Sequence, residues 1–182
     1  NWCRYSCGSV RVSWRLKLIF GTSAIHYARI YALKKHKNQM YGDKPYSYHL
    51  DMVYHTLLTH QVTDADILAA SYLHDLLEDT DVSKKEIELL FGSKVSNLVY
   101  ALTGFGKTRV ERNKHSSDKI LLFGDDAVTL KLADRISNVE NCKANNKKLY
   151  SMYLKENTAF SNKLKGLGNI ALWKTLNSLF GV

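Results

Sequence analysis

The segment ILAASYLHDLLED, residues 67–79, joins an apolar helical run to four polar residues that a buried helix tolerates poorly. Its first half is mostly apolar and predicts a buried helix. His74 and Asp75 follow, and Glu78 and Asp79 come four residues after them, so on a helix each pair shares a face. Charges carried into a core are costly unless they are paired or bound to a metal ion. The segment therefore predicts a helical core with a polar site built into it.

The composition predicts a single all-α domain. The chain has 182 residues, of which 45% are hydrophobic and only one, Pro45, is proline. No apolar run approaches the roughly 20 residues that a membrane helix needs. We expect residues 1–22 to be an N-terminal extension of unknown role and residues 23–182 to form the domain.

Apolar spacing and capping signals place the helices along the chain. Residues 40–47 and 103–117 predict loops, the second of them mobile, and no segment predicts a sheet. The expected helices are 23–39 capped by Ser23, 48–60, one capped by Thr63 or Asp64 and reaching 79, one capped by Ser83 and stopped by Gly92, 94–102, one starting at 126, and 147–180 with a break near 166–168.

Charge and cysteine content limit the partners and the compartment. A formal net charge of +9 suits a polyanion, either a phosphorylated small molecule or nucleic acid, or reflects a generic basic surface. No nucleic-acid-binding motif accompanies the charge, so we do not expect nucleic acid as a partner. Cys3, Cys7 and Cys142 form no even disulfide framework, which indicates reduced thiols in a cytoplasmic protein. The oligomeric state stays open.

Four residues distant in sequence form a candidate metal site: His49, His74, Asp75 and Asp134. Two imidazoles and two carboxylates suit a divalent transition ion such as Mn²⁺, Fe²⁺ or Zn²⁺, with positions left for water. Such an ion lowers the pKa of its bound water and stabilises charge on a phosphoryl oxygen.

Taken one at a time, these residues also have structural explanations. His49 could be a core histidine, and Asp134 could pair with Lys131 or Arg135. The acidic pair at 78 and 79 could be an exposed helix end. The pattern as a whole, however, matches one family signature.

His49, then His74-Asp75, then Asp134 is the pattern of the HD-domain phosphohydrolases, which form helical bundles. The flanking segments narrow the likeness: KPYSYH (44–49), AASYLHDLLEDT (69–80), FGSKVSNLV (91–99) and VTLKLADRISNV (128–139). Over about residues 24–168 the chain resembles the hydrolase domain of RelA/SpoT-type alarmone enzymes, most of all the stand-alone small alarmone hydrolases, including the metazoan SpoT homologue.

The resemblance implies an activity and roles for individual residues. It implies removal of the 3′-diphosphate from (p)ppGpp, giving GDP or GTP and pyrophosphate, with one Mn²⁺ held by the four residues of the candidate metal site. Glu78 and Asp79 match the catalytic acidic pair that activates the attacking water. The implied substrate contacts are Tyr46, Lys131, Arg135, Asn138, Arg109 and Tyr153. A surface or packing role for Arg109 and Tyr153 is an equal alternative.

Departures from the family pattern leave the identity of the nucleotide substrate undecided. Leu50 replaces a usual proline, Ser137 replaces a bulkier residue, and residues 40–43 lack a basic pair for which Lys37 and Lys44 could substitute. The alternatives are a broader HD-domain nucleotide phosphohydrolase, such as an NADPH phosphatase or a nucleotidase, or a non-catalytic nucleotide-binding regulator. An intact acidic pair argues against the regulator.

Overall fold

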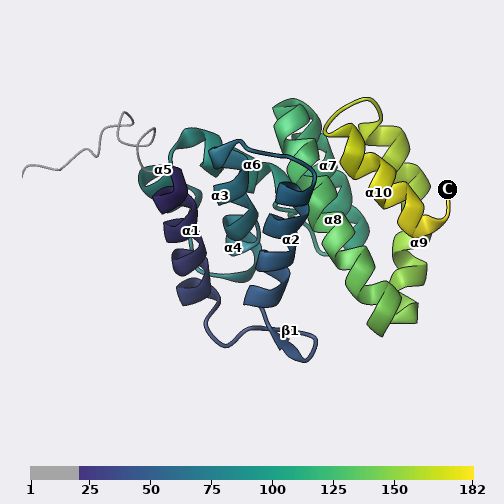
Figure 1. The fold of residues 1–182 in the computed structure, drawn as a ribbon, viewed down its shortest axis with the longest axis horizontal. Coiled ribbons are helices and arrows are strands. Elements are labelled where there is room, and N and C mark those ends of the chain that lie inside the picture. Colours follow the sequence, from purple (N-terminus) through teal and green to yellow (C-terminus); the bar gives the residue numbers. More distant parts are fainter. Residues whose placement is uncertain (1–20) are drawn as a thin grey trace, which may run out of the picture.

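The computed structural model describes residues 21–182, and helices dominate them, which confirms the expected all-α class (Figure 1). The expected extension, Cys3 and Cys7 lie outside the described residues, apart from the start of the first helix. In chain order, the N-terminal elements are α1 (Gly21–His36), β1 (Met40–Tyr41), β2 (Lys44–Pro45), α2 (Ser47–Thr59), α3 (Ala65–Leu73), α4 (Leu76–Asp79), α5 (Lys84–Phe91) and α6 (Ser93–Leu102). The C-terminal elements are α7 (Arg109–Phe123), α8 (Asp125–Asn145), α9 (Lys147–Leu164) and α10 (Ile170–Phe180).

Helix α8 runs through the middle of the bundle and packs against α2, α10 and α9 (Figure 1). On the N-terminal side, α3 packs against α1, α2 and α6. One continuous apolar core joins these helices and includes the fully buried side chains of Leu50, Leu73, Leu132 and Ile136. None of the helices in residues 21–182 is both long and apolar enough to cross a membrane.

Several capping predictions are confirmed. The Asp64 side chain accepts hydrogen bonds from the backbone N–H groups of Asp66 and Ile67, and it begins α3. Ser83 begins α5 by accepting from the N–H of Glu86, and Gly92, at φ +92°, ends that helix. The final helical stretch is broken as expected, because α9 ends at Leu164 and α10 begins after it.

The break between α9 and α10 requires a glycine at position 168. Its φ is +79°, and a Cβ atom there would lie 2.7 Å from Val128 Cγ1. The turn between α9 and α10 therefore packs directly onto α8, which fixes both helices on the central one.

Other sequence expectations were wrong. Helix α1 begins before Ser23, so that residue is not its cap, and it ends at His36 because Lys37 adopts φ +48°. Residues 40–45 form a two-stranded hairpin in which Met40 pairs with Pro45. The expected mobile loop at 103–117 is helical from 109 onward, because Thr108 and Glu111 form a reciprocal capping box that begins α7.

Candidate active site

A cavity of about 670 Å³ opens among the hairpin, α2, α4, α7, α8 and α9. The predicted metal, catalytic and substrate-contacting residues line it, except His74 and the two substitute lysines Lys37 and Lys44. The fold thus brings residues from positions 46 to 153 together at one place.

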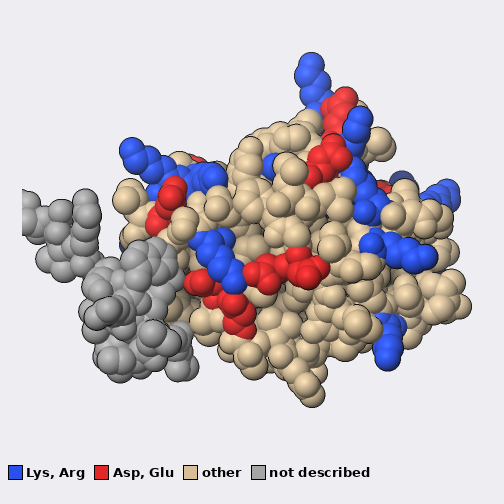
Figure 2. All heavy atoms as spheres, turned by 90° about the horizontal axis from the view of Figure 1, so that it is seen from above, with Lys and Arg blue, Asp and Glu red and all other residues tan. Residues whose placement is uncertain are grey.

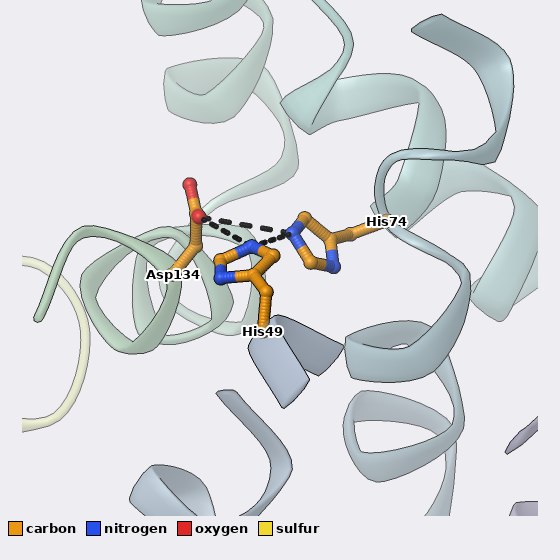
Figure 3. Close-up of side chains that lie close together, drawn as sticks. All are labelled: His49, His74 and Asp134. Atoms are coloured by element: carbon orange, nitrogen blue, oxygen red, sulfur yellow. Dashed lines mark hydrogen bonds and ion pairs between the residues drawn. The ribbon is translucent and has the colours of Figure 1, made fainter. Parts of the chain in front are cut away.

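The two histidines and Asp134 converge on one point in the core (Figure 3). His49 comes from α2, His74 follows α3, and Asp134 lies in α8. Their three potential ligand atoms all lie within 4.8 Å of one another, and all three residues are buried. His49 Nε2 lies 3.3 Å from His74 Nε2 and 3.5 Å from Asp134 Oδ1, and His74 Nε2 lies 3.7 Å from the same oxygen.

Asp75 adds a fourth donor atom to this cluster. Its Oδ2 lies 3.0 Å from His74 Nε2 and 3.5 Å from His49 Nε2. Its side chain is 22% exposed, more than those of the other three, so it faces the cavity.

A break in the helix lets His74 and Asp75 reach the same centre. We expected one helix through residue 79, but α3 ends at Leu73 and α4 begins at Leu76. Consecutive residues of a regular helix point about 100° apart, so adjacent side chains diverge. Asp75, with φ −96° and ψ −3°, leaves the regular helical geometry, and both side chains turn to one point.

Hydrogen bonds behind the cluster orient the imidazoles. His74 Nδ1 lies 2.8 Å from the carbonyl oxygen of Ser71, which can only accept, so Nδ1 carries the proton and Nε2 offers its lone pair to the cluster. His49 Nδ1 lies 3.2 Å from the Ser137 hydroxyl. Ser137 had been noted only as a departure from the family pattern, and it proves to contact a candidate ligand.

The distances fit a single divalent ion. Two ligand atoms at about 2.1 Å from an ion, at tetrahedral to right angles, lie roughly 3.0–3.4 Å apart. The separations of 3.0 to 3.7 Å among these nitrogens and oxygens are close to that range. Two nitrogen and two oxygen donors also match the mixed sets that bind divalent transition ions. The residues present therefore fit a metal ion.

The electrostatics of the cluster also favour a cation. Burial disfavours protonated His74, but Asp75 and Asp134 outweigh burial and hold its pKa well above the ordinary value. Burial likewise disfavours ionised Asp134, yet Lys131 and the two histidines keep its pKa well below the ordinary value. The centre thus attracts positive charge.

Glu78 and Asp79 lie one turn beyond the cluster and line the same cavity. Burial raises the pKa of Glu78, although the backbone N–H of Gly104 donates a hydrogen bond to its Oε1. A carboxylate with a raised pKa is better suited to accept a proton near neutral pH. Asp79 Oδ2 accepts a 2.7 Å hydrogen bond from the Gln39 amide, which anchors the loop after α1.

Lys119, which sequence reasoning missed, supports the segment that holds Glu78. It is buried on α7, and its ammonium donates to the carbonyl oxygens of Tyr100, at 2.6 Å, and Thr103, at 2.5 Å. It also lies 4.0 Å from the Tyr100 ring centroid. These contacts fix the end of α6 immediately before Gly104. Nothing in the sequence pattern distinguishes Lys119 from the other lysines of this basic chain.

This burial predicts a pH dependence of stability. Burial lowers the pKa of Lys119 from 10.5 to about 8. Between these values the unfolded chain holds the proton more tightly, so the free energy of unfolding should rise with pH across this window. The rise should be weaker in Lys119→Met, as measured by urea unfolding at pH 7.5 and 9.5. Identical pH dependence in the two proteins would contradict this account.

The predicted substrate contacts divide into two groups. Near the metal cluster, Tyr46 donates a 2.5 Å hydrogen bond to Asp75 Oδ2, and Lys131 donates at 2.8 Å to Asp134 Oδ2. Asn138 donates at 2.6 Å to Asp134 Oδ1 and accepts at 2.9 Å from the Tyr41 hydroxyl. These side chains therefore position the candidate ligands as well as lining the cavity.

The second group lies between α7 and α9. Arg109 and Arg135 lie on the ring of Tyr153, at 5.0 and 5.1 Å from its centroid. Arg109 is also held by Glu156, a residue that we did not single out from the sequence. Of the two lysines offered as substitutes for the missing basic pair, neither lines the cavity, and Lys44 lies over the Tyr48 ring.

Known proteins resemble this chain in both sequence and fold. Residues 28–159 match the family model of the HD domain. The chain is 32% identical over 117 residues to guanosine-3′,5′-bis(diphosphate) 3′-pyrophosphohydrolase MESH1 of Danio rerio, covering 61% of this chain and 64% of the relative. It is 33% identical over 134 residues to GTP pyrophosphokinase rsh of Brucella melitensis, covering 69% of this chain and only 18% of the relative.

A solved structure agrees with these matches. The structure described as "A metazoan ortholog of SpoT hydrolyzes ppGpp and plays a role in starvation responses" superposes with a TM-score of 0.78 at 27% identity. The match covers 87% of this chain and 94% of that one. The helical bundle, the convergent His-Asp cluster and the family match over residues 28–159 together mean that this chain belongs to the HD domain family.

Proposed function

We propose that the chain is a metal-dependent guanosine-3′,5′-bis(diphosphate) 3′-pyrophosphohydrolase that acts in the cytoplasm with Mn²⁺. The observation that carries the proposal is the convergence of two imidazoles and two carboxylates beside Glu78 in one open cavity. The activities named for the metazoan relatives support the choice of substrate.

In this proposal, His49, His74, Asp75 and Asp134 would hold one divalent ion. When bound, such an ion lowers the pKa of water and stabilises charge on a phosphoryl oxygen. The fit of the donor atoms supports these roles, because their separations suit a single ion. Tyr46, Lys131, Asn138 and the backbone of Ser71 keep the donors oriented.

The chain's own residues account for the proton transfers. Glu78 accepts a proton from the attacking water, and the Gly104 N–H fixes its carboxylate. The water oxygen bonds to the phosphorus attached to O3′ and the O3′–P bond breaks. Glu78 then gives the proton that it took from the water to O3′, and pyrophosphate leaves. Asp79 lines the cavity beside Glu78 and helps to orient the water.

A side-by-side assay tests the proposal against a broader phosphohydrolase. The protein, with Mn²⁺, is offered ppGpp, NADPH and deoxynucleoside monophosphates, and released pyrophosphate and phosphate are measured. We expect pyrophosphate from ppGpp with the highest kcat/KM. Phosphate from NADPH or a deoxynucleotide without pyrophosphate from ppGpp would replace this proposal with the broader one. Binding of ppGpp without any turnover would indicate the regulator instead.

A further inference from the structure

Glu156 places a negative charge among the positive side chains of the cavity. It lies on α9, one turn after Tyr153, and it lines the cavity. Its carboxylate accepts two hydrogen bonds from Arg109, from Nε at 2.8 Å and from Nη2 at 3.2 Å. A planar pair of this kind is the strong form of an arginine–carboxylate contact.

The same carboxylate reaches a second arginine. Arg135 Nη1 lies 3.8 Å from Glu156 Oε2, and the Arg135 side chain is only 6% exposed. The Asn113 amide adds a 3.3 Å hydrogen bond to Oε1. Both guanidinium groups also lie beside the Tyr153 ring, at 5.0 and 5.1 Å from its centroid, so Arg109, Arg135 and Glu156 form one cluster next to it.

One side-chain donor of Arg135 makes no hydrogen bond within the described residues. Its Nη2 donates to the Tyr153 carbonyl at 3.1 Å, but within the described residues its buried Nε has no acceptor. Arg135 also lines the cavity, so its guanidinium group can take an anionic partner there.

Two lysines that line the cavity are paired with neighbouring carboxylates. Lys131 is paired with Asp134, and Lys163 is paired with Asp118. On the face drawn in Figure 2, Lys and Arg side chains stand in separate groups with Asp and Glu between them. Glu156 lies within reach of both Arg109 and Arg135, and it cancels one of their two charges.

We propose that Glu156 determines specificity by competing with the anionic substrate for Arg109 and Arg135. This proposal rests on the proposed function for the identity of the substrate. The carboxylate weakens binding of phosphorylated nucleotides, and it does so more strongly as the charge of the nucleotide increases. It therefore affects binding and leaves the chemical step alone, since none of its contacts involves Glu78 or the metal cluster.

The isosteric variant Glu156→Gln separates charge from shape. Its amide oxygen still accepts a hydrogen bond from Arg109, so the guanidinium stays on Tyr153 while the negative charge is gone. We expect KM for ppGpp to fall about tenfold with kcat nearly unchanged, and KM for pppGpp, with one more phosphate, to fall further. Raising the salt concentration should narrow the difference between variant and wild type.

Glu140→Gln is the matched control, because Glu140 is exposed on α8, outside the cavity, and loses the same charge. Its KM should match that of the wild type. An unchanged or higher KM in Glu156→Gln, in protein whose thermal unfolding matches the wild type, would overturn the proposal. So would an equal fall in KM in both variants, because that would be an effect of net charge alone.

A binding measurement keeps this inference separate from the assigned activity. Titration calorimetry with inorganic pyrophosphate, in the presence of Mn²⁺, should give a lower Kd for Glu156→Gln than for the wild type. If ppGpp is not hydrolysed but pyrophosphate binds more tightly to the variant, the proposed function fails and the role of Glu156 stands. If pyrophosphate binds both proteins equally, the role of Glu156 fails.

Discussion

Glu78→Gln is expected to lower kcat by about 10²–10⁴-fold, because the amide cannot accept a proton from the attacking water. The variant keeps the shape of the side chain, and its amide oxygen can still accept the hydrogen bond from the Gly104 N–H. The metal cluster does not include this residue, so bound metal should stay at the wild-type level. Pyrophosphate release and metal content, measured on the same preparation, check both expectations.

Glu88→Gln is a matched control for this variant, since Glu88 is exposed on α5 and does not line the cavity. It should retain full activity. Wild-type turnover in Glu78→Gln would show that another group, with Asp79 the first candidate, accepts the proton. Loss of metal in Glu78→Gln would instead assign the residue to the metal site.

His74→Ala is expected to lose both metal and activity. The side chain is buried, and its Nε2 lies within 3.7 Å of donor atoms of His49, Asp75 and Asp134. Removing it leaves one imidazole and two carboxylates, which repel each other more strongly without an ion between them. We expect a fall of more than about 100-fold in metal affinity, because even changes to residues behind the ligands cost 10–100-fold.

Metal content per chain and the rate of pyrophosphate release measure these effects. His55→Ala is the control, because that histidine is exposed on α2, the helix that also carries His49, and lies outside the cavity. A His74→Ala protein that keeps one tightly bound ion per chain would remove His74 from the ligand set.

The sequence predicted the cluster from residue types rather than from geometry. His74, Asp75 and Asp134 stand out because each is polar beside apolar residues, where charge needs a partner, and His49 joins them through the family pattern. The argument from helical spacing was less sound, since the helix breaks between Leu73 and Leu76. Periodicity does not encode this break, which depends on two adjacent side chains turning to one centre.

Local signals explain the error at α7. Gly104 and Gly106 suggested a loop, yet Thr108 and Glu111 carry the capping-box spacing that begins the helix. Gly104 is required for close packing, because a Cβ atom there would lie 2.8 Å from the Arg112 carbonyl oxygen. The glycine marks a close approach between α7 and the end of α6, and its N–H is the one that holds Glu78.

The side of the cavity between α7 and α9 contains a residue that the sequence did not point to. Arg109 and Tyr153 could be predicted, but their common partner Glu156 could not, because an acidic residue on a charged helix looks like solvent-exposed surface. Its place one turn after Tyr153 was the available signal. Lys119 gave no comparable signal, since its importance comes from burial alone.

Metal loading measured together with turnover tests the central claim most directly. Metal-free protein is titrated with Mn²⁺ while bound metal and pyrophosphate release from ppGpp are recorded on the same samples. The account predicts that both rise together and level off at one ion per chain. Full turnover by metal-free protein, or a fully loaded protein that releases no pyrophosphate from ppGpp, would contradict it.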